Sequence, residues 1–106
     1  MNIVITFFKN RYQKYLLGKL CKFKSNSSVF AQLAAFSKSE LAIEKNYMES
    51  CLSNYKLHPY DLEYLSNYNH HYERYCEYMN QYNFYFSQYE FCNKKIEHLE
   101  KKLNNL

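Results

Sequence analysis

The residues with the most chemical potential in this chain are four cysteines and four histidines. They are Cys21, Cys51, Cys76 and Cys92, and His58, His70, His71 and His98. No two cysteines form a C-x-x-C pair, and no Cys and His are four residues apart, as ligands on one helical face would be. Zinc sites are built on such spacings. We therefore expect no metal site and reduced thiols, with Cys51 and Cys92 acting as small apolar residues of a packing stripe.

The sequence also offers no setting for catalysis. A nucleophilic thiol or hydroxyl needs a base held beside it in a pocket, and we expect a thin helical chain of 106 residues to build no such pocket. Gly18 and Pro59 are the only glycine and the only proline, so a glycine-rich phosphate loop is excluded and long helices are favoured. The sequence predicts a non-enzymatic, all-α protein without catalytic residues or cofactors.

The clearest boundary along the chain is Pro59, which is tolerated in the first turn of a helix. Asp61 and Glu63 follow it and would complement the positive end of the helix dipole. Beyond this point, apolar residues recur at steps of three and four, as in a coiled coil, with one phase slip around Met79, Tyr82 and Tyr85. The predicted stripe is Leu65, Tyr68, Tyr72, Tyr75, Met79, Tyr82, Tyr85, Tyr89, Cys92, Ile96, Leu99, Leu103 and Leu106.

The residues before Pro59 also carry a helical pattern. Leu41, Met48 and Tyr55 repeat every seven residues, whereas Ser25–Ser28 is a polar run that could interrupt a helix. Two arrangements are open: one long helix, or a three-helix arrangement with a break near residues 25–28. Because the run contains neither Gly nor Pro, we favour the long helix.

The resulting prediction is a single antiparallel two-helix coiled-coil hairpin over residues 1–106. Helix one spans about residues 3–57, the turn about 57–60, and helix two about 60–105. Residues 1–24 carry six cations and no acid, and Lys94, Lys95, Lys101 and Lys102 form a second basic cluster. A hairpin would bring both clusters to the same tip and leave the turn neutral or acidic.

Such a basic tip could meet a protein, a nucleic acid or an anionic membrane surface. Residues 1–24 contain only one Arg, and their cations are scattered around the helix, which disfavours nucleic acid. Cations and apolar residues are mixed around the wheel in residues 3–23, which disfavours more than peripheral membrane contact. An acid-free start is also typical of mitochondrial presequences, an alternative that we rank below a basic first helix. A protein partner is favoured.

The tyrosines of the second helix are too numerous for one seam. His71, Tyr75, Tyr78 and Tyr82 follow steps of four, three and four, forming a strip beside the predicted stripe. Tyrosine gives large, stiff contact area with a polar tip, which suits a protein interface. Equally open is the alternative that these rings belong to the hairpin core. We expect His70 and His71 to be solvated.

Several segments resemble the small coiled-coil stalk proteins of flagellar and type III secretion export, the FliJ/YscO group. The similar residues cover about half of the chain. The resemblance begins at Ala42-Ile43-Glu44-Lys45 and continues through Tyr55. It is strongest in Asn67–Tyr75 and ends at Gln81 and Ser87-Gln88-Tyr89. Two features depart from the family pattern: His71 replaces a bulky apolar residue, and the chain lacks much of the distal coil.

The resemblance implies a cytoplasmic stalk or adaptor that the export apparatus can hold at the inner face of the membrane. The partners would be the export ATPase, the cytoplasmic domain of the export gate, and export chaperones. Gate-contacting positions carry over to His71, Tyr75, Tyr78 and Tyr82. The terminal pole, which enters the ATPase ring, corresponds to the basic residues Lys9, Arg11, Lys14, Lys94, Lys95, Lys101 and Lys102. Alternatives are a small helical secretion chaperone or inhibitor, and a basic coiled coil associated with nucleic acid.

Overall fold

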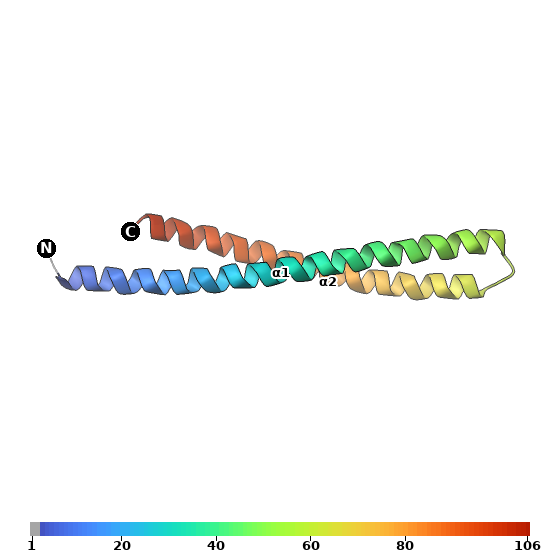
Figure 1. Ribbon diagram of the computed structural model, residues 1–106, viewed down its shortest axis with the longest axis horizontal. Coiled ribbons are helices and arrows are strands. Elements are labelled where there is room, and N and C mark those ends of the chain that lie inside the picture. The colour runs from blue at the N-terminus through green and yellow to red at the C-terminus, as the bar shows by residue number, and fades with distance from the viewer. Residues whose placement is uncertain (1–2) are drawn as a thin grey trace. The chain divides into compact units, whose positions relative to one another are not determined.

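The computed structural model describes residues 3–106 and contains two long helices (Figure 1). Helix α1 spans Ile3–Leu57 and helix α2 spans Glu63–Asn104. The two helices are joined by residues 58–62 and run antiparallel, and no strand occurs in the described residues. The all-α, two-helix hairpin predicted from the sequence is confirmed.

Helix α1 continues through Ser25–Ser28 without interruption, so the three-helix alternative is wrong. The polar run is accommodated because Ser27 faces α2. Its side chain is 7% exposed, and its hydroxyl donates a 2.8 Å hydrogen bond to Oδ1 of Asn93. A polar residue that is satisfied across the interface need not break a helix.

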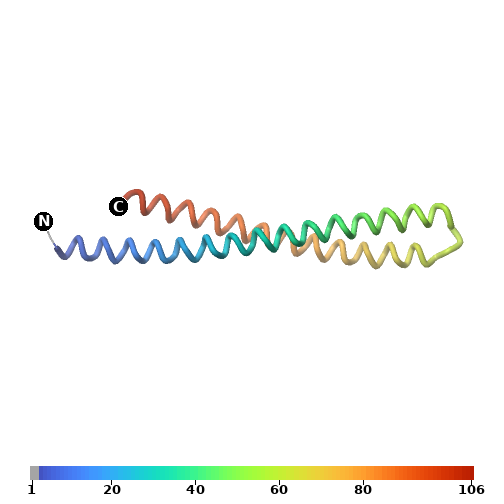
Figure 2. The backbone as a smooth tube through the Cα atoms, viewed as in Figure 1, coloured from blue at the N-terminus to red at the C-terminus, as the bar shows by residue number. Residues whose placement is uncertain are grey.

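The chain forms two compact units. Figure 2 traces the backbone through both of them, from the N-terminus in blue to the C-terminus in red. Unit 1 combines the part of α1 up to Ala31 with Phe86–Leu106, and unit 2 comprises Gln32–Tyr85. Each unit therefore contains a segment of both helices. Unit 2 also contains the turn.

The core of unit 1 is small and aliphatic. Leu16 is 1% exposed, Leu20 is 8% exposed, and both pack in one cluster with Leu99. Partly buried side chains close around this cluster, namely Phe23, Ile96 and Leu103. Because α1 contributes residues at steps of four and three, this is a coiled-coil seam.

In unit 2, the buried side chains of α1 that face α2 are one leucine and otherwise small or polar residues. Ala34, Ser37, Leu41 and Glu44 are all buried. The opposing helix supplies half-buried tyrosines instead of leucines. Rings on one helix above small side chains on the other are a way to fill an interface that has few aliphatic residues.

The seam of α2 differs from the predicted stripe at three places. Tyr64, His71 and Tyr78 are half-buried and continue an unbroken heptad through Tyr68, Tyr75, Tyr82 and Tyr85. Tyr72, which the stripe had included, is 50% exposed, while Leu65 and Met79 are half-buried beside the seam. The seam therefore needs no phase slip. Leu106 is 37% exposed and lies beyond the end of α2.

The turn explains why α2 begins at Glu63 rather than at the expected residue 60. The Asp61 amide donates to the His58 carbonyl (3.0 Å), which closes a β-turn with Pro59 at its second position. The Asp61 carboxylate then accepts a 3.1 Å hydrogen bond from the Glu63 amide. The Asp61 side chain therefore caps the Glu63 amide at the start of α2, and residues 58–62 belong to the turn.

Candidate functional site

The basic residues that the sequence singled out all belong to unit 1 and are exposed. Lys9, Arg11 and Lys14 lie on α1, in a stretch, residues 3–15, that is exposed throughout. Lys94, Lys95, Lys101 and Lys102 lie in the last turns of α2, where cations also complement the helix dipole.

Not all of these cations come together in one place. Lys95 and Lys102 line a hollow between the two helices, together with Lys19 of α1 and with His98. Lys94 and Lys101 do not line it. The sequence analysis placed no role on Lys19 or His98. Their positions could have been found by pairing the flanks of the two heptad stripes, because Lys19 precedes Leu20 just as Lys95 precedes Ile96.

Aromatic rings position several of these cations. The Lys19 ammonium lies 4.9 Å from the centroid of the Tyr15 ring, and the Lys95 ammonium lies 5.5 Å from that of Phe91. On the exposed start of α1, the Arg11 guanidinium lies 5.7 Å from the Phe7 ring. Cation–π contacts of this kind hold the charged groups over the rings while leaving them open to a partner.

The four expected gate contacts lie elsewhere, in unit 2. His71, Tyr75, Tyr78 and Tyr82 are all half-buried along the α2 seam. Each therefore presents only part of its side chain to solvent. Their role in partner binding remains a prediction.

His71 belongs to a buried polar cluster that the sequence analysis missed. Its Nδ1 lies 2.6 Å from Oε2 of Glu44, and the Glu44 side chain is 3% exposed. The Arg74 Nε forms an ion pair with the other carboxylate oxygen, Oε1, at 3.3 Å. The Tyr47 ring stacks on the imidazole at 4.8 Å between centroids. The expectation that His71 is solvated is wrong, whereas His70 is exposed.

Glu44 could have been found from the sequence. It lies three residues after Leu41 and four before Met48, at a position where the heptad of α1 requires a buried side chain. A carboxylate at such a position needs a partner on the facing helix, because an unpaired buried charge is costly.

Two ionisable groups near this cluster are perturbed. A hydrogen bond with the Tyr78 hydroxyl, followed by the charge of Glu44, raises the pKa of Arg74. On the outer face of α2, a hydrogen bond with Cys76 raises the pKa of the Tyr72 hydroxyl above its ordinary value of 10.0. Arg74 thus remains charged, which suits its contact with Glu44.

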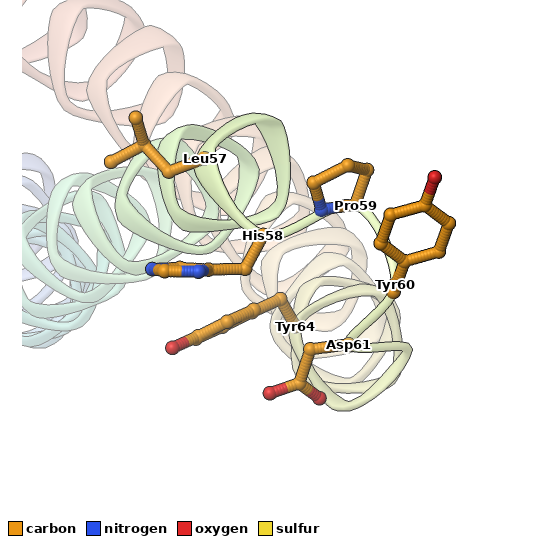
Figure 3. Close-up of a pocket in the computed structure, with 6 residues that line it drawn as sticks. All are labelled: Leu57, His58, Pro59, Tyr60, Asp61 and Tyr64. Atoms are coloured by element: carbon orange, nitrogen blue, oxygen red, sulfur yellow. The ribbon is translucent and has the colours of Figure 1, made fainter.

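A second hollow lies at the turn (Figure 3). Leu57, Pro59 and Asp61 contribute to its lining, and the His58 ring stacks on Tyr64 at 6.0 Å. Tyr60, which also lines it, is 97% exposed. The hollow is therefore open and does not enclose a ligand.

Within residues 3–106, no group of three or more His, Cys, Asp or Glu side chains is placed to hold a metal ion. The four cysteines are unpaired, and of these Cys92 is buried. Neither described helix contains a stretch that is both long and apolar enough to cross a bilayer.

These features define a two-helix antiparallel coiled coil with a basic surface in one unit and a buried polar cluster in the other. Comparisons with protein-family models, with curated proteins and with solved structures found no match to this chain.

Proposed function

We propose that this chain is a non-enzymatic stalk or adaptor of a type III protein-export apparatus, of the flagellar or the virulence kind. In this role it couples the export ATPase ring to the export gate and the export chaperones, in the cytoplasm at the inner face of the membrane. The helical hairpin is the fold that the resemblance implies.

One observation carries the proposal: the acid-free start of α1 and the basic end of α2 belong to the same compact unit. Within this unit, Lys19 of α1 and Lys95 and Lys102 of α2, which are distant in the sequence, line one hollow. Exposed cations concentrated in this way favour an acidic partner and accelerate its association. In the proposed role, that partner is the ATPase ring, and His71, Tyr75, Tyr78 and Tyr82 supply the gate contact through their accessible edges.

The first test uses biolayer interferometry to measure how tightly the chain binds the purified export ATPase encoded in the same genome. We expect the variant Lys9→Glu/Arg11→Glu/Lys14→Glu to bind at least roughly tenfold more weakly than the native chain, because attraction becomes repulsion. The matched control Lys38→Glu/Lys45→Glu/Lys56→Glu makes the same charge change at exposed positions of α1 in unit 2. It should bind like the native chain.

Absence of binding by the native chain at low ionic strength would contradict the stalk role. The neighbouring genes distinguish the alternative functions: an export ATPase gene supports a stalk, whereas an effector gene supports a secretion chaperone or inhibitor. Retention of nucleic acid at moderate salt would favour the third alternative, since purely electrostatic binding decays steeply with salt.

A further inference from the structure

The hollow in unit 1 has an apolar floor and cationic sides. Phe23 and Leu99 form part of its lining, and Lys19, Lys95, His98 and Lys102 surround them. We call this hollow the basic groove. Its volume of about 180 Å³ lies below the roughly 300 to 1,000 Å³ of small-molecule pockets. It has room for individual side chains of a docked segment.

The charges of the basic groove are unusual for a coiled coil. Lys19 on α1 and Lys95 and Lys102 on α2 line the same hollow, beside the seam residue Leu99. Positions flanking a seam commonly carry opposite charges that pair across the helices. Here three lysines converge, and no Asp or Glu is among the lining residues. Like charges facing each other destabilise the hairpin slightly, so this arrangement suits an anionic ligand.

Other pairings in unit 1 do not neutralise the basic groove. The nearby acid Glu100 faces Lys24 at 3.6 Å instead, and neither residue lines the hollow. The opposite flank is therefore charge-paired, while the groove side carries cations from both helices.

Exposed rings extend the groove along both helices. Tyr15, beneath the Lys19 ammonium, is 55% exposed, and Phe91, beneath that of Lys95, is 51% exposed. An apolar floor between aromatic rings and lysines matches a helix with apolar residues on one face and carboxylates on either side. Phosphate groups would use the lysines and leave the floor and rings without partners.

We propose that the basic groove binds an acidic amphipathic helix of a protein partner, which packs as a third helix of the coiled coil. The groove lysines pair with the carboxylates of this helix, while its apolar residues lie over Phe23 and Leu99. This inference deepens the proposed function and rests on it for the kind of partner. The groove itself can be tested without any export component.

The test uses a synthetic helical peptide with Leu at steps of three and four and Glu on both sides of this stripe. A second peptide has Gln in place of each Glu. Binding to the full chain is measured by fluorescence anisotropy. We expect saturable binding of the Glu peptide and roughly tenfold weaker binding of the Gln peptide, because the groove lysines then have no carboxylates to pair with.

Two variants locate the binding site. Lys95→Glu/Lys102→Glu reverses two groove lysines and should weaken binding of the Glu peptide at least roughly tenfold. Lys38→Glu/Lys45→Glu makes the same charge change at exposed positions of α1 in unit 2, outside the groove, and should bind like the native chain. Circular dichroism checks that both variants fold. In Lys95→Glu/Lys102→Glu the new carboxylates face Lys19, so the melting temperature of this variant should be no lower than that of the control.

Equal loss of binding in the two variants would overturn the proposal, because net charge alone would then explain the affinity. Equal binding of the Glu and Gln peptides would also overturn it. The ligand would be a nucleic acid instead of an acidic helix if two results were found together. A single-stranded oligonucleotide would bind more tightly than the Glu peptide, and only Lys95→Glu/Lys102→Glu would lose this binding. If the peptide results hold but the export ATPase does not bind, the groove stands and the stalk function fails.

Discussion

At the scale of single residues, Glu44 is the most informative side chain. It is almost fully buried on α1, yet its side chain ends in an ionisable carboxyl group, which contacts both His71 and Arg74 of α2. Buried polar groups at one position of a coiled coil can fix the register of its helices, because any shift would leave them unpaired. We therefore expect Glu44 to help fix the alignment of the two helices in unit 2.

The variant Glu44→Gln tests how much this carboxyl group contributes to the stability of the hairpin. It keeps the size of the side chain but removes the carboxyl group that contacts His71 and Arg74. We expect the free energy of unfolding to fall by about 1 to 2 kcal/mol, measured by urea denaturation followed by circular dichroism. Glu49→Gln, at an exposed position of the same helix, is the control and should change stability little. A Glu44→Gln variant as stable as the native chain would show that burying the carboxylate costs as much as its contacts contribute.

At the scale of the elements, the two helices differ in how they fill their common interface. In unit 2, α1 contributes small residues such as Ala34 and Ser37, and α2 contributes half-buried tyrosines. The Ser37 hydroxyl is fully buried without a hydrogen-bond partner. An interface with such groups gains less from burial than one of leucines, so the tyrosine rings supply much of its stability.

Alanine substitutions distinguish the observed α2 seam from the one predicted from the sequence. Tyr75→Ala should lower the free energy of unfolding by about 2 kcal/mol, because a half-buried ring leaves the interface. Tyr72→Ala removes a ring that is 50% exposed and should cost less than about 1 kcal/mol. Urea denaturation measures both values. Equal costs would place Tyr72 in the interface as well and contradict the unbroken heptad.

The sequence predicted the helices well because their signals are local. Pro59 marked the turn. Helix α1 contains no Pro and only one Gly, Gly18, which allowed one continuous helix. The prediction failed at Tyr72 and Met79 because adjacent positions, His71 and Tyr78, offered a competing stripe of similar spacing. By hydropathy, His71 is a poorer candidate for the seam than Tyr72. The contact of His71 with the buried Glu44 nevertheless decides which of these two side chains faces α1.

The candidate site was predictable only in part, for a related reason. Lys95 and Lys102 were recognised as members of a basic cluster, but their separation from Lys94 and Lys101 depends on which face of α2 meets α1. The contribution of Lys19 depends on the pairing of two helices that are distant in the sequence. Neither property is visible in a single periodic pattern.

At the scale of the whole chain, the two units carry different chemistry. The cations of the proposed ATPase contact and the basic groove belong to unit 1, and the polar cluster of Glu44 belongs to unit 2. This division depends on antiparallel pairing, which places the end of α2 beside the start of α1 within one unit.

Lysine cross-linking with mass spectrometry tests this pairing most directly, because the native chain already carries the necessary amines. A mixture of isotopically labelled and unlabelled chains separates cross-links within one chain from those between chains. The account predicts links from Lys19 to Lys95 and to Lys102 within single chains, since all three line one groove. Links from Lys19 to these two lysines only between chains, or to neither of them, would contradict it.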